Sequence, residues 1–100
     1  METRVGKGTD VAPGQMRRFQ VERMAVTIAN VAGRLYAFDD TCTHQGCSLA
    51  AGELEASTVT CPCHGSQFDV TSGEVLRGPA DEPVRSLVVD IQGPILVVRS

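Results

Sequence analysis

Every histidine and cysteine of the chain falls in one of two short segments. CTHQGC spans residues 42–47 and CPCHGS spans residues 61–66, and together they hold two histidines and four cysteines. Thiolates and imidazoles ligate zinc as well as iron–sulfur clusters, so ligand type alone leaves the metal open. Gly46 and Gly65 predict a tight turn in each segment that aims its ligands inward. The pattern predicts a metal site gripped between two loops.

The spacing of these residues distinguishes between metals better than their types do. Each segment supplies one cysteine and then one histidine, first Cys42 with His44 and then Cys61 with His64. Zinc fingers usually group like ligands, two cysteines followed by two histidines. The alternation here suits a two-iron cluster, with one iron held by the two cysteines and the other by the two histidines.

The pattern C-x-H, sixteen intervening residues, then C-x-x-H resembles the Rieske [2Fe–2S] motif, in which two histidines replace two cysteines on one iron. The resemblance runs from about Val11 to the C-terminus through AFDDTCTH, CPCHGSQFD and TSGEVLRGPA. It implies one cluster, with Cys42, His44, Cys61 and His64 as ligands. Neutral imidazoles leave such a cluster less negative than four thiolates would, and its potential lies at about −150 to +300 mV.

The resemblance also implies roles for residues beside the ligands. High-potential Rieske proteins carry a disulfide at the positions of Cys47 and Cys63, which predicts the same bond here. The alternative is two free thiols, because disulfides are rare in the cytosol. Ser66 matches a serine that donates a hydrogen bond to a cluster sulfide and stabilises the reduced state. The alternative for Ser66 is a hydroxyl that caps its loop.

Two further positions of the resemblance bear on the cluster. Phe68 stands where high-potential members usually have a tyrosine that donates a hydrogen bond near the cluster. We therefore expect a potential below that of quinol-oxidising proteins, with Phe68 packed in the core. Gly78-Pro79-Ala80 resembles the proline loop that covers the third side of the cluster, and the alternative is an ordinary turn. Core positions are also expected at Leu49, Leu54, Leu76 and Val84.

The rest of the chain has the pattern of short strands separated by frequent turns. Glycine and proline fill 15 of 100 positions, and no sustained helical periodicity occurs outside residues 48–51. Turns are predicted at residues 30–33, 71–73 and 92–94. Strands are predicted at residues 16–21, 24–29, 34–38, 58–61, 67–70, 74–76, 85–91 and 95–99.

These elements predict an all-β sandwich or barrel-like fold. The resemblance refines this to stacked antiparallel sheets of the Rieske type with a cluster-binding subdomain of two loops. We expect a single domain over residues 1–100, with the cluster-binding part at about 40–80 and the first dozen residues loosely held.

Charge is distributed unevenly along the chain. Residues 1–38 hold six Lys or Arg and three Asp or Glu, whereas residues 39–100 hold three and nine, a net charge of −6. This disfavours nucleic acid and suits a protein partner with a basic docking patch. No segment approaches the roughly 20 apolar residues of a membrane span, nor does the N-terminus resemble a signal peptide. We expect a cytoplasmic protein without a membrane anchor.

The predicted function is that of a Rieske ferredoxin, a one-electron carrier and not itself an enzyme. Its expected partners are a flavin-dependent reductase and an oxygenase-type terminal acceptor. One alternative is the Rieske subunit of a larger high-potential oxidoreductase complex, which Ser66 and the Cys47/Cys63 pair favour. Others are a structural zinc-binding interaction domain and a thiol–disulfide oxidoreductase that uses Cys61-Pro62-Cys63, although ligation fits this spacing better.

Overall fold

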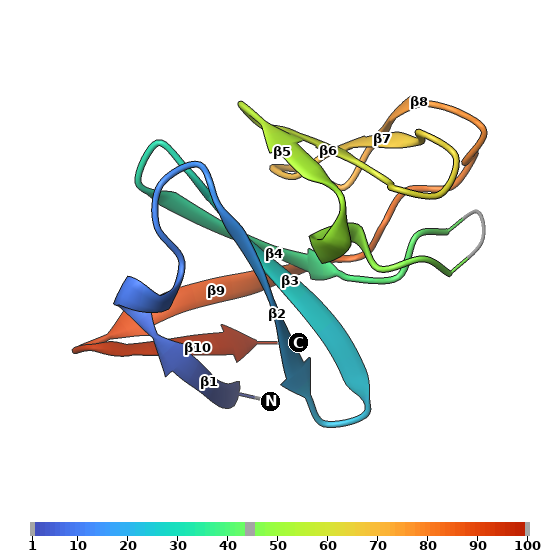
Figure 1. Ribbon diagram of the computed structural model, residues 1–100. Coiled ribbons are helices and arrows are strands. Elements are labelled where there is room, and N and C mark those ends of the chain that lie inside the picture. Colours follow the sequence, from blue (N-terminus) through green and yellow to red (C-terminus); the bar gives the residue numbers. More distant parts are fainter. Residues whose placement is uncertain (1, 44–45, 100) are drawn as a thin grey trace.

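The computed structural model describes residues 2–43 and 46–99, which form two antiparallel sheets (Figure 1). The larger sheet has the strand order β1-β10-β9-β4-β3-β2 and the smaller one the order β5-β6-β7-β8. The edge strands β1 and β2 of the larger sheet contact each other, so that it curls towards a barrel. The predicted all-β class is confirmed. Within the described ranges no helix is long and apolar enough to cross a membrane.

The strands of the larger sheet are β1 (Glu2–Lys7), β2 (Met16–Val21), β3 (Met24–Val31), β4 (Arg34–Asp39), β9 (Ser86–Gln92) and β10 (Ile95–Arg99). The smaller sheet contains β5 (Glu53–Glu55), β6 (Thr58–Thr60), β7 (Gln67–Asp69) and β8 (Val75–Arg77). Two single-turn 3₁₀ helices, η1 (Gly8–Asp10) and η2 (Leu49–Ala51), lie in the connections.

Local sequence explains the β3–β4 hairpin. Its two-residue loop has Ala32 at φ 53° and Gly33 at φ 94°, the pair of positive φ values that a type I′ turn requires. The Asn30 side chain accepts a hydrogen bond from the Gly33 N–H (2.8 Å) and donates one to the Val11 carbonyl (2.9 Å). The predicted turn at residues 30–33 is confirmed, and Asn30 also ties it to the preceding loop.

The core between the two sheets surrounds the two cysteines that begin the predicted ligand segments. Ala29 and Phe38 of the larger sheet pack in one buried cluster with Val59, Phe68, Leu49 and both Cys42 and Cys61. Phe68 is fully buried, which confirms its predicted place in the core. A second buried cluster fills the interior of the curled larger sheet. The ligand segments therefore start inside the hydrophobic core.

Two expectations from the sequence are wrong. The N-terminal residues are not loosely held, because β1 pairs with β10 and Arg99 forms an ion pair with Glu2 at 2.6 Å. Figure 1 shows the two termini close together beside this pair of strands. Leu76 is not a core residue, since it is 52% exposed. It lies on the edge strand β8, where successive side chains point to opposite faces and its neighbour Val75 takes the packed position.

Gly52 lets η2 lie against the second sheet, which yields a testable prediction. A Cβ atom there would lie 1.9 Å from the Thr60 carbonyl oxygen, although the φ of −87° is open to any residue. Gly52→Ala should therefore lower the free energy of unfolding by about 1–3 kcal/mol or more, because backbone must move. Urea unfolding measures this. The control Gly8→Ala, whose new Cβ would have its nearest contact at 3.5 Å, should stay within about 0.5 kcal/mol. Equal losses in both variants would contradict the steric argument.

Candidate metal centre

Two loops of matching backbone geometry carry the predicted ligands. In the first, residues 42–47, the Cys42 N–H donates to the Cys47 carbonyl (2.9 Å) and the Gly46 N–H to the Cys42 carbonyl (2.8 Å). The second, residues 61–66, repeats both hydrogen bonds at the corresponding positions, at 2.8 and 3.1 Å. The fifth residue of each loop is a glycine with positive φ, 74° in the first and 78° in the second. The predicted tight turns are confirmed.

The ligand cysteines lie side by side in the core. Cys42 and Cys61, the two cysteines predicted to be ligands, are 2% and 3% exposed, and neither is in a disulfide. Burial is the main reason that the pKa of the Cys61 thiol lies above its ordinary value; the neighbouring Cys42 thiol raises this pKa further, and the N–H groups of Cys63 and His64 oppose the rise. Two buried thiolates side by side need a compensating cation, and a metal centre supplies one.

Only one of the two predicted histidine ligands belongs to the described residues. His64 is exposed, at the fourth position of the second loop. His44 lies outside the described residues. The described part of the site thus consists of two buried thiols and one exposed histidine in the second loop. The structure brings Cys42 and Cys61 together and puts His64 where a protein partner can reach it.

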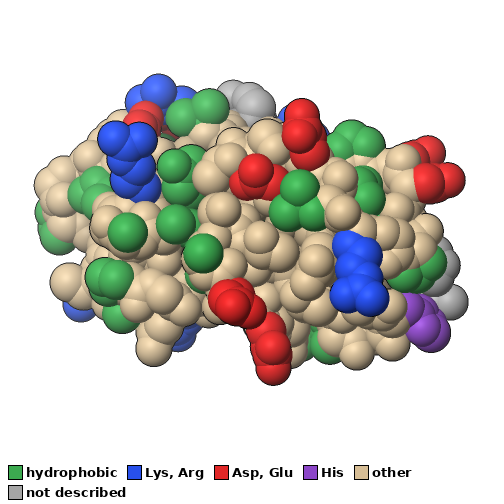
Figure 2. Space-filling model, turned by 90° about the horizontal axis from the view of Figure 1, so that it is seen from above, with side chains coloured by type: hydrophobic (Ala, Val, Ile, Leu, Met, Phe, Trp, Pro, Cys, Tyr) green, Lys and Arg blue, Asp and Glu red, His purple; other side chains and the backbone are tan. Residues whose placement is uncertain are grey.

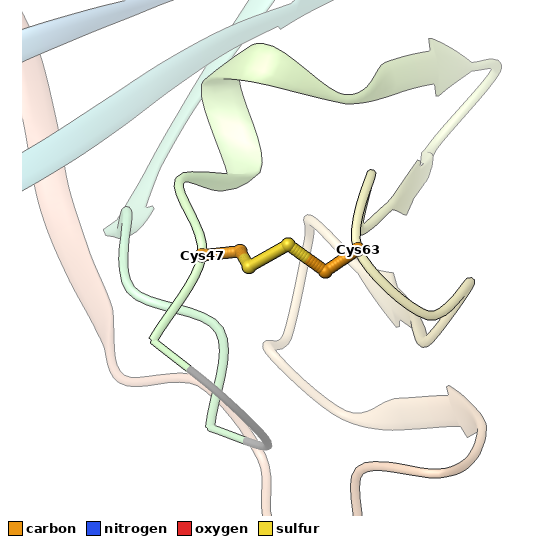
Figure 3. Close-up of a disulfide and its surroundings, with 2 residues drawn as sticks. All are labelled: Cys47 and Cys63. Carbon is orange, nitrogen blue, oxygen red and sulfur yellow. A yellow bond between two sulfur atoms is a disulfide. The ribbon is translucent and has the colours of Figure 1, made fainter.

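A disulfide joins the two loops. Cys47 and Cys63, the pair that the resemblance implies, are bonded, with their Cα atoms 6.5 Å apart. Figure 3 shows this bond crossing from the first loop to the second. The Sγ atoms of Cys47, Cys61 and Cys63 all lie within 4.8 Å of one another, so that the bond runs directly beside Cys61. Since disulfide sulfurs do not serve as thiolate ligands, Cys42 and Cys61 are the thiols left for a metal.

A third segment, residues 78–82, is fastened to both loops. Ser66 is fully buried, and its Oγ accepts a hydrogen bond from the Ala80 N–H at 3.0 Å. Thr43 in the first loop donates from its Oγ1 to the Glu82 carbonyl at 2.8 Å. The Ser66 hydroxyl proton stays available to a further acceptor, because a hydroxyl both donates and accepts. Gly78 and Pro79 themselves are exposed.

The sequence reasoning missed one residue of this region, Asp40. It is the only buried carboxylate among the described residues, at 2% exposed, and it stands two positions before Cys42. The available signal was its place between an apolar strand and a ligand loop, in AFDDTCTH. Paired acidic residues at a strand end are ordinarily solvated, so the pattern alone did not single out Asp40.

The amino-acid sequence of this chain is similar to those of known proteins. A family model described as Rieske [2Fe-2S] domain matches residues 1–88. The ferredoxin component of biphenyl 2,3-dioxygenase from Rhodococcus jostii (strain RHA1) is 35% identical over 96 residues, which cover 96% of this chain and 90% of that protein. The cytochrome b6-f complex iron-sulfur subunit of Chlorobaculum thiosulfatiphilum is 32% identical over 97 residues, 97% of this chain and 52% of that protein.

Solved structures give the same family. One chain in a complex of reduced oxygenase and oxidized ferredoxin of carbazole 1,9a-dioxygenase superimposes with a TM-score of 0.90 at 31% identity, over 97% of this chain and 91% of that one. Two buried thiols on paired loops, with an exposed histidine in the second loop, offer the donor atoms of a mixed cysteine–histidine metal centre. The chain belongs to the Rieske [2Fe-2S] domain family, and its cofactor is one Rieske-type [2Fe–2S] cluster. The donor atoms present fit this cluster.

The disulfide yields a testable prediction about stability. It closes a loop with a sequence separation of 16, for which chain entropy predicts a contribution of about 3 kcal/mol. The double variant Cys47→Ser/Cys63→Ser should therefore unfold at lower denaturant concentration by this order. A matched control is the wild type in the presence of reductant, which should approach the double variant. Equal midpoints for all three samples would mean that the bond contributes nothing to stability.

Proposed function

We propose that Cys42 and Cys61 hold one iron of the cluster and that His44 and His64 hold the other. The observation that carries this assignment is the pair of buried free thiols on two matching loops, with His64 exposed on the second of them. For His44 the support is its spacing from Cys42 in the C-x-H segment. Cys47 and Cys63 serve as the tie between the loops.

The proposed function is one-electron transfer, from a flavin-dependent reductase to the terminal oxygenase of a multicomponent oxygenase system. The names of several relatives support it: ferredoxin components of biphenyl, 2,4-dinitrotoluene and naphthalene dioxygenase systems are 29–35% identical to this chain. The protein itself performs no bond chemistry and is not an enzyme. The bound cluster supplies reversible uptake of a single electron.

The residues around the cluster site have different roles in such a carrier. The core position of Cys42 and Cys61 excludes water from their side of the site. The exposed His64 gives an electron a short exit to a docked partner. Ser66 has a hydroxyl proton to donate and Phe68 has none, so one hydrogen-bond donor of high-potential proteins is kept and the other is lost. This combination favours the lower part of the Rieske range of potentials.

The charge of the chain suits a partner with a basic docking surface. Residues 39–100, which contain both loops, carry a net charge of −6. Figure 2 shows acidic side chains at several separate places on the face seen from above, with basic ones between them. The proposed steering therefore comes from the overall charge of this half of the chain, and not from one acidic patch on this face.

The remaining assignments are proposals of the same kind. We place the protein in the cytoplasm, as a single domain over residues 1–100 with its cluster-binding part at about 40–80, and without nucleic acid as a partner. The β5–β8 sheet, within residues 53–77, is the framework of that part.

One alternative function has a specific observation in its favour. The Cys47–Cys63 disulfide and Ser66 match high-potential Rieske proteins, and the cytochrome b6-f subunit of Chlorobaculum thiosulfatiphilum is 32% identical. The chain spans about half of that protein's length. In this alternative the chain is the electron-accepting subunit of a larger high-potential complex.

A redox titration followed by absorption or electron paramagnetic resonance tests the proposed function. We expect a potential in the lower half of the range of about −150 to +300 mV, because Phe68 supplies no hydrogen bond. Prior reduction of the disulfide is the control for its influence. A clearly positive potential would favour the high-potential complex, and a protein without any redox-active chromophore would overturn the cluster assignment.

His64→Cys tests the ligand assignment. A cysteine ligand adds one negative charge, which disfavours the reduced state. The potential of the assembled cluster should fall by on the order of 100 mV or more, towards the ~−400 mV of all-cysteine plant-type clusters. His64→Ala is the control and should lose iron, because it offers no ligand atom. Unchanged iron content and potential in both variants would remove His64 from the ligand set.

A further inference from the structure

The two cluster loops are closed at their bases in different ways. The second loop (residues 61–66) leaves and re-enters a regular ladder, since Thr60 pairs with Gln67 where β6 meets β7. The first loop (residues 42–47) has no such ladder. Thr41 and Ser48 form a single isolated bridge, after which the chain turns into η2. Something other than strand pairing must hold the base of the first loop.

Asp40 occupies this base. Its main chain forms a hydrogen bond on each side of this base. Its N–H donates to the Ala25 carbonyl (3.0 Å), and its carbonyl accepts from the Leu49 N–H (2.7 Å). Ala25 belongs to β3 of the larger sheet and Leu49 to η2. The backbone of Asp40 thus links the larger sheet to η2, the segment that follows the first loop.

The carboxylate of Asp40 repeats this link with its side chain. Its Oδ1 accepts the Thr27 hydroxyl from β3 (2.5 Å) and the Ala50 N–H from η2 (2.8 Å). Its Oδ2 lies 3.3 Å from the Nε of Arg18 on β2. β2 and β3 already pair here, with Arg18 opposite Thr27, and the Asp40 side chain joins η2 to this pair.

The burial of this carboxylate makes the link strong. A buried charge is costly unless hydrogen bonds and a counter-charge compensate it, and here Thr27, Ala50 and Arg18 do so. Hydrogen bonds to a charged group are stronger than those between neutral groups. Removal of the acceptor leaves the buried Thr27 hydroxyl and Ala50 N–H unpaired, so that the two sides separate or admit water.

We propose that Asp40 is a positioning residue that clamps the base of the first cluster loop to the larger sheet, in place of the strand pairing that holds the second loop. The inference rests on the proposed function only in taking Cys42 as a ligand. Its central observable, the order of the loop backbone, needs neither a partner nor electron transfer.

Hydrogen–deuterium exchange of the cluster-loaded protein, read by mass spectrometry of peptides, tests the clamp. In Asp40→Ala the peptide with the Cys42, Gly46, Leu49 and Ala50 amides should exchange roughly tenfold faster or more, because the Ala50 N–H and the Thr27 hydroxyl lose their acceptor and the base of the loop opens. The peptide with the Cys61 and Gly65 amides should stay within about twofold of wild type. Thr27→Val replaces the hydroxyl donor with a side chain of similar volume. It should also speed the exchange of the first-loop peptide, but by less.

The neighbouring carboxylate provides the matched control. Asp39 accepts the Thr41 N–H at 2.9 Å in an exposed hydrogen bond, and Asp39→Ala should leave the first-loop peptide within about threefold of wild type. A second readout is the reduction potential: Asp40→Asn removes a buried negative charge near Cys42 and should raise it, by more than Asp39→Asn does.

The outcomes separate a clamp from general stability. Faster exchange confined to the first loop supports the proposal. Equal acceleration in both loops would assign Asp40 to overall stability and overturn the proposal, as would unchanged exchange in both Asp40→Ala and Thr27→Val. Failure of the proposed electron transfer would appear separately, in the redox titration, and would leave the exchange result intact.

Discussion

Keeping two thiols adjacent inside the core is the constraint on which the rest of this structure depends. Burial raises the pKa of Cys61, and a second thiol beside it makes two negative charges harder still to hold without a cation. A cation that meets both sulfurs at once requires the two loops to hold these sulfurs close together. Each loop meets this requirement locally with the same two backbone hydrogen bonds and a glycine of positive φ. What differs is how each loop is attached to the molecule.

The attachment uses every neighbouring segment. Strand pairing holds the second loop, Asp40 and the Thr41–Ser48 bridge hold the first, and the Cys47–Cys63 bond ties one loop to the other. Ser66 and Thr43 then fasten residues 78–82 across the same region, one through a buried hydrogen bond and one through an exposed hydrogen bond. The larger sheet contacts the loops through Asp40 and through Ala29 and Phe38, which pack in one buried cluster with Cys42 and Cys61. This sheet supports the loops: β4 leads directly into the first loop, and β9 follows residues 78–82.

Sequence patterns predicted the features that depend on residues nearby in the chain. They failed for residues whose environment depends on contacts with distant parts of the chain. The loop glycines and the hairpin turn at residues 30–33 depend on neighbours in the chain, and these predictions agree with the structure. β1 could not be predicted because ETRVGK has no apolar alternation, and its partner β10 lies at the other end of the chain. Asp40 looked like a surface residue, because its compensating groups come from β2, β3 and η2. The misassigned Leu76 shows the converse: an apolar residue on a short edge strand lacks an opposing layer.

The apparently conflicting signs of high and low potential in this chain are reconciled by where each residue lies. A reduction potential responds to charge and to hydrogen-bond donors at the cluster. The disulfide adds neither, and with Cys63 exposed and Cys47 half-buried it lies at the surface side of the loops. Phe68, by contrast, is fully buried in the cluster of core residues that contains both ligand cysteines, where a tyrosine hydroxyl would count. We therefore expect the disulfide to act on the geometry of the loops, and its presence is compatible with the low potential that Phe68 predicts.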